Sequence, residues 1–139
     1  PISDTPDGRE YLEPARPGMY ALDLRNGEYI WKSPAENICR EDQQYCQPGY
    51  PAAITVIDQI VIAGSNDGHL RIFDVETGQI LWDRDTAIEF DSLGGGKAKG
   101  GSFGGGAAPI AFKSQLIVNS GYGFAGKMPG NALLVFEAK

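Results

Sequence analysis

The hydrophobic pattern of this chain follows the two-residue period of β-strands and nowhere a convincing helical period. Between Leu70 and Phe73, apolar side chains flank Arg71, which fits a half-buried strand. Short runs rich in aliphatic and β-branched residues predict further strands at 59–64, 110–112 and 115–118. The pattern therefore predicts an all-β fold.

A tight turn is expected directly after the strand at Leu70. Residues 74–78 read Asp-Val-Glu-Thr-Gly, and Gly78 can take the positive φ that other residues avoid. The Asp74 carboxylate can accept turn N–H groups, as in Asx-turns. Residues 79–82 then restart an extended run that ends at Trp82, and Asn-Asp-Gly at 66–68 signals a hairpin further upstream.

The strand–turn–strand unit occurs twice. Asp23, Gly27 and Trp31 match Asp74, Gly78 and Trp82 at one offset, since 74 − 23, 78 − 27 and 82 − 31 all equal 51. A third, truncated copy lies at residues 133–137, with a glutamate in the place of the aspartate. Repeats of about 40 to 50 residues with a recurring turn are typical of β-propeller blades.

The repeat predicts four-stranded antiparallel sheets, each of which must lean on a neighbouring sheet to bury its faces. Rings close with about four to eight blades, so 139 residues predict part of a larger ring rather than a complete one. We expect residues 1–31 to hold the end of one blade and a crossover, 32–82 one full blade, and 83–139 the last blade. A cut or split ring, or a complete small protein that associates through open strand edges, both remain open.

Charge and hydropathy exclude some partners. The chain has 12 Lys+Arg against 18 Asp+Glu, a net charge of −6, without a basic cluster to follow a phosphate backbone. Nucleic acid is therefore not an expected partner. No apolar run approaches the roughly 20 residues that span a bilayer, and we expect no membrane span.

Two cysteines, Cys39 and Cys46, lie in one polar loop. A disulfide between them is sterically feasible and is the expected state, with free thiols as the alternative. An even cysteine count favours an oxidising compartment, so a periplasmic or secreted location is expected. A metal site is not expected, because the single histidine, His69, lies in a turn elsewhere.

These motifs resemble those of the pyrroloquinoline quinone (PQQ) dependent alcohol dehydrogenases. The family motif Asp-x-x-Thr-Gly-x-x-x-Trp is matched fully from Asp74 to Trp82, and from Asp23 to Trp31 with Asn26 in place of threonine. The C-terminal part resembles the last blade of polyvinyl-alcohol dehydrogenases in particular, through Gly-Gly-Ser at 100–102, Gly-Ala-Ala-Pro at 106–109, Asn-Ser-Gly-Tyr at 119–122 and Met-Pro-Gly-Asn-Ala-Leu-Leu at 128–134.

The resemblance implies an eight-bladed propeller that oxidises alcohol groups by hydride transfer to PQQ, with Ca²⁺ as a second cofactor. It also implies that Gly126, Lys127, Met128 and Asn131 line one wall of the cofactor pocket, with Lys127 pairing with a cofactor carboxylate. The remaining blades are the implied partners, with a cytochrome c as a further electron-accepting partner. The catalytic base and the metal ligands would come from blades outside this chain, so the chain alone is expected to be inactive.

The sequence also departs from the pattern. Lys127 and Met128 stand where methanol-type enzymes place a Gly-Trp pair, Cys39 and Cys46 are not adjacent, and a Cys-x-x-Cys-His haem motif is missing. A non-catalytic propeller that serves as an envelope scaffold or binding module is therefore the alternative. Ser102 lies in a Gly-x-Ser-x-Gly motif, but an esterase is not expected, because the histidine precedes the serine and no strand-to-helix turn surrounds it.

Overall fold

The structure is a computed structural model that describes residues 2–5, 8–11 and 13–138, and within these residues every regular element is a strand. The strands, in chain order, are β1 (Ile2–Thr5), β2 (Gly8–Tyr11), β3 (Gly18–Leu22), β4 (Tyr29–Pro34), β5 (Thr55–Ile57), β6 (Ile60–Gly64), β7 (His69–Asp74), β8 (Ile80–Asp85), β9 (Glu89–Asp91), β10 (Lys97–Lys99), β11 (Ile110–Phe112), β12 (Gln115–Ser120) and β13 (Ala132–Glu137). The predicted all-β fold is confirmed. Across the described ranges there is no helix that is long and apolar enough to cross a membrane.

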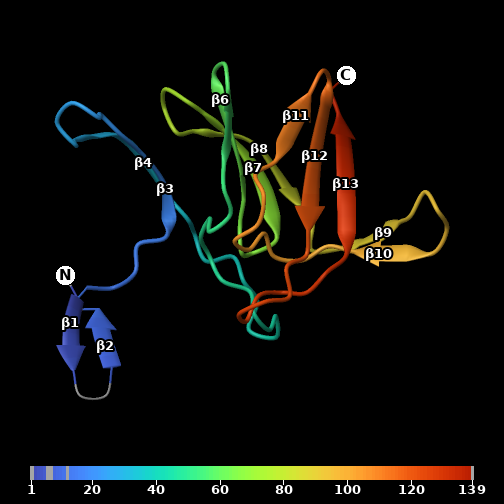
Figure 1. The fold of residues 1–139 in the computed structure, drawn as a ribbon, viewed down its shortest axis with the longest axis horizontal. Coiled ribbons are helices and arrows are strands. Elements are labelled where there is room, and N and C mark those ends of the chain that lie inside the picture. Colours follow the sequence, from blue (N-terminus) through green and yellow to red (C-terminus); the bar gives the residue numbers. More distant parts are fainter. Residues whose placement is uncertain (1, 6–7, 12, 139) are drawn as a thin grey trace.

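The central element is a four-stranded antiparallel sheet in the order β5-β6-β7-β8. Each strand pairs with its neighbour in sequence, as in a propeller blade. A three-stranded sheet, β11-β12-β13, lies beside it, and the β3-β4 hairpin lies on its other side (Figure 1). The β1-β2 hairpin lies apart from these sheets, at the lower left of the view. The predicted blade-like antiparallel sheets are therefore present.

The central sheet is buried on both faces because its strands alternate between two cores. Val61 and Phe73 pack with Met19 and Trp31 in the core shared with the β3-β4 hairpin. Ile62 and Leu70 face the other way, into the core shared with the three-stranded sheet. Trp82 and Phe136 meet there edge to face, with ring centroids 5.5 Å apart. These aromatic residues therefore pack in the cores between neighbouring sheets.

The predicted turn after β7 is present in detail. Asp74 Oδ1 accepts the backbone N–H groups of Glu76 and Thr77 and the Thr77 hydroxyl, at 3.0, 2.8 and 2.8 Å. The Thr77 hydroxyl, followed by the backbone N–H bonds, lowers the pKa of Asp74. Gly78 has φ +71°, as the turn requires.

The turn also joins two sheets. The indole of Trp31 lies over Gly78, where an added Cβ would be only 2.4 Å from Trp31 Cε3. The same indole donates its N–H to the Val75 carbonyl oxygen at 2.8 Å. Trp31 therefore binds the sheet that follows it in the chain, and it does so against a position where only glycine leaves room.

The 51-residue repeat is a structural repeat as well. The register between β3 and β4 shifts at Ala21/Leu22, and that between β7 and β8 shifts at Ile72/Phe73, which are 72 − 21 = 51 positions apart. Gly27 has φ +73°, close to the value at Gly78. The two copies of the motif thus share a fold.

One detail of the expectation is wrong. The crossover expected at the end of residues 1–31 is not found there, because β4 (Tyr29–Pro34) pairs antiparallel with β3 in a hairpin. Similarly, β8 pairs with β7 and completes the central sheet. The β9-β10 hairpin was not expected, because the glycines at its tip hide the strand pattern. The division into blades at residues 31 and 82 stays a prediction.

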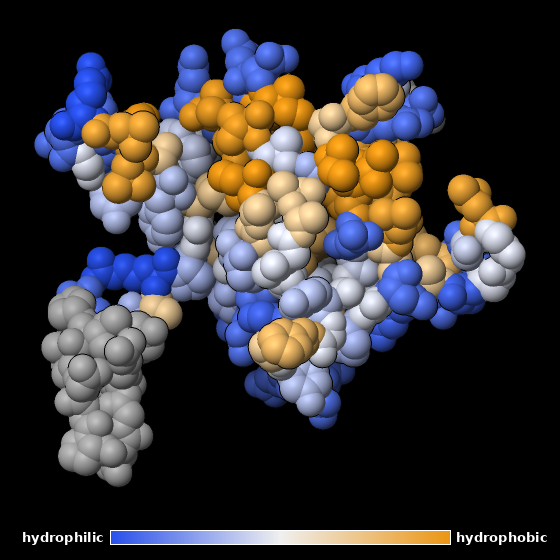
Figure 2. Space-filling view, viewed as in Figure 1, coloured by the Kyte–Doolittle hydropathy of each residue, from blue (hydrophilic) through white to orange (hydrophobic). Residues whose placement is uncertain are grey.

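The three-stranded sheet turns an apolar face outward. Figure 2 shows apolar side chains gathered over β12 and β13. Leu133 and Val135 of β13 are exposed, because they alternate with the inward-facing Leu134 and Phe136. Ile110 and Phe112 of β11 are exposed as well. An exposed apolar face of this kind is typical of a surface that packs against another element or molecule.

Candidate functional site

Four connections gather at one end of the sheets, around residue 102. They are the turn at 65–68 between β6 and β7, the segment at 100–104 after β10, the loop at 121–131 between β12 and β13, and the loop at 35–54 between β4 and β5. Phe103 N–H bonds to the Ser65 carbonyl, and Ser102 N–H bonds to the Met128 carbonyl, both at 3.0 Å. Hydrogen bonds thus join segments far apart in sequence.

Three buried hydroxyls fasten these segments. Thr86, Ser102 and Ser120 are 0%, 0% and 1% exposed. The Thr86 hydroxyl donates to the Gly68 carbonyl at 2.7 Å and lies 2.7 Å from the Ser120 hydroxyl. The Ser120 Oγ accepts the N–H of Gly101 at 3.0 Å. Every hydroxyl is therefore paired, as burial requires.

The hydroxyl of Ser102 both donates and accepts a hydrogen bond with backbone groups. Its Oγ donates to the Asn66 carbonyl at 2.6 Å and accepts the Met128 N–H at 2.9 Å. A buried hydroxyl held between two backbone groups cannot reach a substrate. The Gly-x-Ser-x-Gly motif is thus a packing motif here, in agreement with the expectation that it is no esterase elbow.

Glycines allow these segments to lie against each other. A Cβ on Gly100 would be 1.7 Å from the Thr86 carbonyl oxygen, and one on Gly101 would be 2.4 Å from that of Met128. A Cβ on Gly121 would be 2.2 Å from Gly130 Cα, so the two ends of the 121–131 loop touch. Part of the glycine-rich stretch therefore runs where no side chain fits.

The residues that the resemblance implies as cofactor contacts all lie on the 121–131 loop. Met128 is buried, Lys127 is half-buried, and Gly126 and Asn131 are exposed. Asn131 Oδ1 accepts the N–H of Lys99 at 2.9 Å, and Asn131 N–H bonds to the Lys99 carbonyl at 2.7 Å. The side-chain oxygen of Asn131 is therefore used within the fold, which leaves its amide NH₂ group as the donor toward a ligand. Their role as cofactor contacts stays a prediction.

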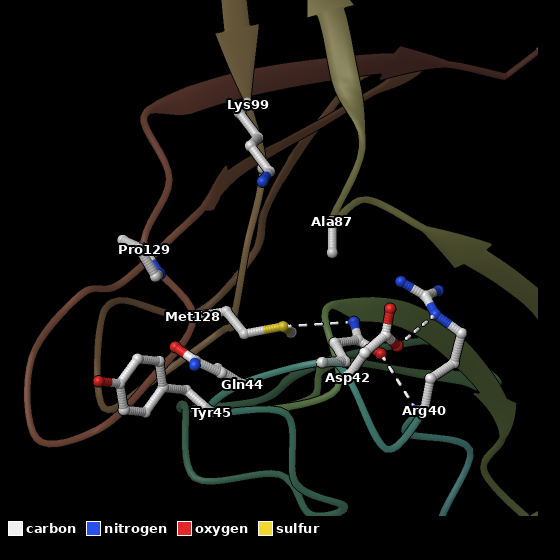
Figure 3. Close-up of a pocket in the computed structure, with 10 residues that line it drawn as sticks. Arg40, Asp42, Gln44, Tyr45, Ala87, Lys99, Met128 and Pro129 are labelled. Carbon is white, nitrogen blue, oxygen red and sulfur yellow. Dashed lines mark hydrogen bonds and ion pairs between the residues drawn. The ribbon is translucent and has the colours of Figure 1, made fainter.

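A cavity of about 420 Å³ lies beside this loop. Of the predicted contacts, Met128 lines it. Lys99 points into it from one side, and Arg40 and Asp42 lie on another (Figure 3). Arg40 and Asp42 form an ion pair at 3.3 Å. Arg40, Tyr45 and Lys99 were not expected as neighbours of Met128, because they precede it by 88, 83 and 29 residues in the sequence.

The cysteine loop forms part of the cavity wall. Cys39 and Cys46 are joined in a disulfide, with Cα atoms 5.6 Å apart, so the predicted disulfide is present. Between them, Gln43 donates its side-chain N–H to Met128 Sδ at 3.4 Å. The disulfide thus constrains a loop that contacts the predicted cofactor wall.

A buried ion-pair network lies away from the cavity, in the central sheet. Arg71 bonds to Asp67 and Asp83 at 3.0 Å each, and to the Tyr50 hydroxyl at 3.2 Å. Burial opposes the charge on Arg71, but Asp67, Tyr50 and Asp83 together raise its pKa. Burial also raises the pKa of Tyr50. His69 Nδ1 lies 2.6 Å from Asp83 Oδ1, so the single histidine belongs to this network.

One buried acceptor near the loop has no partner among the described residues, namely Asn66 Oδ1. Asn66 is 6% exposed. Its backbone carbonyl accepts the hydrogen bond of the Ser102 hydroxyl, which itself accepts the N–H of Met128. A buried acceptor without a hydrogen-bond partner is uncommon in a folded protein, and a water molecule or a ligand is the usual source of the donor. In the described part of the chain, no group of three or more His, Cys, Asp or Glu residues could hold a metal ion.

The known proteins that are similar to this chain in sequence include several alcohol dehydrogenases. No family model matches the chain. A polyvinylalcohol dehydrogenase of Sphingopyxis sp. (strain 113P3) is 41% identical over 110 residues, 77% of this chain and 17% of that protein. A polyvinylalcohol dehydrogenase of Pseudomonas sp is 38% identical over 119 residues, 84% of this chain and 18% of that protein.

Another relative and one solved structure are less similar to this chain. A quinohemoprotein alcohol dehydrogenase ADH-IIG of Pseudomonas putida is 32% identical over 83 residues, 60% of this chain and 12% of that protein. BamB of Moraxella catarrhalis is a solved structure with 18% identity and a TM-score of 0.45, covering 73% of this chain and 28% of that chain. The resemblance to quinoprotein alcohol dehydrogenases, and to polyvinyl-alcohol dehydrogenases in particular, is confirmed. The chain spans less than a fifth of the length of these two polyvinylalcohol dehydrogenases.

Proposed function

We propose that this chain is the C-terminal segment of a PQQ-dependent alcohol dehydrogenase of the polyvinyl-alcohol type, and that its loops form one wall of the cofactor pocket. The observation that carries the proposal is the 41% identity to a polyvinylalcohol dehydrogenase over 110 residues. Sheets with the meander order of blades support it. The whole enzyme oxidises alcohol groups, and this chain alone is inactive because the base comes from elsewhere.

The residues present fit PQQ, a flat group with several carboxylates and a ring N–H. Lys127 supplies a cation for a carboxylate, and the Asn131 NH₂ group supplies a donor. When bound, PQQ accepts the hydride from the alcohol carbon. The role of this chain is to bind and orient.

The remaining blades are the first partners in this proposal, and Ca²⁺ is held mostly by those blades. A related 1-butanol dehydrogenase of Thauera butanivorans is named for cytochrome c and is 31% identical over 85 residues, 61% of this chain and 12% of that protein. We therefore include a cytochrome c as the electron acceptor. The disulfide between Cys39 and Cys46 supports a periplasmic or secreted location.

The test uses the purified full-length protein with PQQ and Ca²⁺. We expect the absorbance of bound quinone after removal of free PQQ, and reduction of an artificial dye when polyvinyl alcohol or a small secondary alcohol is added. Protein without PQQ is the control. A folded protein that neither binds PQQ nor reduces the dye would favour the non-catalytic scaffold.

A further inference from the structure

Ser102 joins two points of the 121–131 loop, which carries the predicted cofactor contacts. Its backbone N–H bonds to the Met128 carbonyl at 3.0 Å, and its carbonyl accepts the N–H of Gly121 at 3.2 Å. Its hydroxyl accepts the N–H of Met128 at 2.9 Å. One buried residue therefore holds the start of the loop and a point seven residues further on.

The hydroxyl also ties this loop to a third segment. It donates to the Asn66 carbonyl at 2.6 Å, so a group that both donates and accepts is needed at this position. An alanine would leave the Met128 N–H and the Asn66 carbonyl without the partner that each has now. Unpaired buried backbone groups are costly, so the loop would move to find other partners.

Lys127 is placed by the same short segment. It directly precedes Met128, whose N–H and carbonyl are both bonded to Ser102. A Cβ on Gly104 would lie 3.1 Å from Lys127 Cγ, so the lysine stem passes over this glycine. Residues 102–104 thus fix both the backbone and the side-chain stem that carry the ammonium group.

We propose that Ser102 is a positioning residue for the cofactor wall: by holding the Met128 backbone it aims the Lys127 ammonium at a carboxylate of the bound PQQ. This inference rests on the proposed function. In this proposal the Gly-x-Ser-x-Gly motif orients a ligand-binding lysine. The glycines on either side of the serine leave room for the lysine side chain and the loop backbone to lie against the motif.

The experiment compares Ser102→Ala with Thr86→Val in the full-length protein. Both remove a fully buried hydroxyl, but Thr86 bonds to Gly68 and Ser120 and makes no hydrogen bond to Met128. Hydrogen exchange of peptides covering 121–131 is measured without cofactor. The dissociation constant for PQQ is measured by equilibrium dialysis with Ca²⁺ and without substrate.

In Ser102→Ala we expect exchange at the Met128 amide to become faster by about tenfold, and the PQQ dissociation constant to rise by about tenfold. In Thr86→Val we expect both to stay near the wild-type values. Lys127→Met should weaken binding by itself, and adding Ser102→Ala to it should weaken binding little further. A side chain that acts through Lys127 must lose its effect when the ammonium group is gone.

Gly104→Ala keeps every Ser102 hydrogen bond but pushes on the Tyr122 ring and the Lys127 stem, which would lie 2.8 and 3.1 Å from the new Cβ, so it serves if Ser102→Ala does not fold. It should raise the PQQ dissociation constant as well. Unchanged exchange in Ser102→Ala, equal weakening in Thr86→Val, or full additivity with Lys127→Met would each overturn the inference while the proposed function stands. A wild-type protein that does not bind PQQ would overturn both.

Discussion

Replacing Gly78 by alanine tests the contact that joins neighbouring sheets. The turn holds Gly78 at φ +71°, and an added Cβ would lie 2.4 Å from Trp31 Cε3. Gly27→Ala is the matched control. Gly27 lies in the first copy of the same turn at φ +73°, and among the described residues beyond its two chain neighbours no atom lies within 4 Å of the place of its Cβ.

The two variants share one cost and differ in another. Alanine in the left-handed region costs about 1–2 kcal/mol relative to glycine, and this cost applies at both Gly27 and Gly78. At Gly78 the indole must also move away, which breaks the 2.8 Å bond from Trp31 Nε1–H to the Val75 carbonyl. Losing that bond and part of the ring packing adds about 2 kcal/mol.

Urea unfolding followed by fluorescence measures the difference. With a slope of about 1–3 kcal/mol per molar urea, the extra 2 kcal/mol lowers the midpoint of Gly78→Ala by about 1 M below that of Gly27→Ala. In a Trp31→Ala background, Gly78→Ala should cost no more than Gly27→Ala. Equal midpoints for the two single variants would refute the claim that the indole contact stabilises the sheets.

Three further predictions follow from the other contacts. Arg71→Met leaves the nearly inaccessible carboxylate of Asp67 without its cation and should lower the free energy of unfolding by about 3–5 kcal/mol, measured by thermal or urea unfolding. Opening the disulfide with Cys39→Ser and Cys46→Ser together should cost about 2 kcal/mol and speed proteolysis within 35–54. The pKa of Asp74 is lowered in the folded state, so its ionised form stabilises the fold at pH values above the unfolded pKa, near 3.8. This stabilisation is lost as the pH falls from that value through the lower folded pKa. Asp74→Asn should remove this part of the acid dependence in unfolding curves at pH 2–6, and an unchanged pH profile would contradict the assignment.

Local features of the fold could be predicted from the sequence because they depend on neighbouring residues. The turn at Asp74 and Gly78 needs one carboxylate and one glycine a few residues apart, and both the hydrogen bonds and the positive φ are present. The pairing of Cys39 with Cys46 was expected because a short loop brings the cysteines together. The direction of β4 was missed, because a run of apolar residues does not tell which strand it will pair with.

The site was predictable only in part. The 121–131 loop was singled out through a family resemblance, but its anchoring was not, because Asn66, Ser102 and Met128 meet from distant parts of the sequence. Ser102 illustrates the difficulty. The position of the histidine before the serine argued against a nucleophile in the Gly-x-Ser-x-Gly motif, but the sequence did not indicate which groups the serine would bond to, and these became clear only from its complete burial and its hydrogen bonds.

The bond from the Trp31 indole to the following turn has a consequence for how such chains lengthen. Both full copies of the motif carry the two residues of the joint, an indole and a turn glycine, and where the copies meet in this chain the indole of the first lies over the glycine of the second. A duplicated gene segment would therefore encode a unit already able to attach on both sides. Growth by tandem duplication needs no newly evolved interface, which is a physical reason for repeats of constant length.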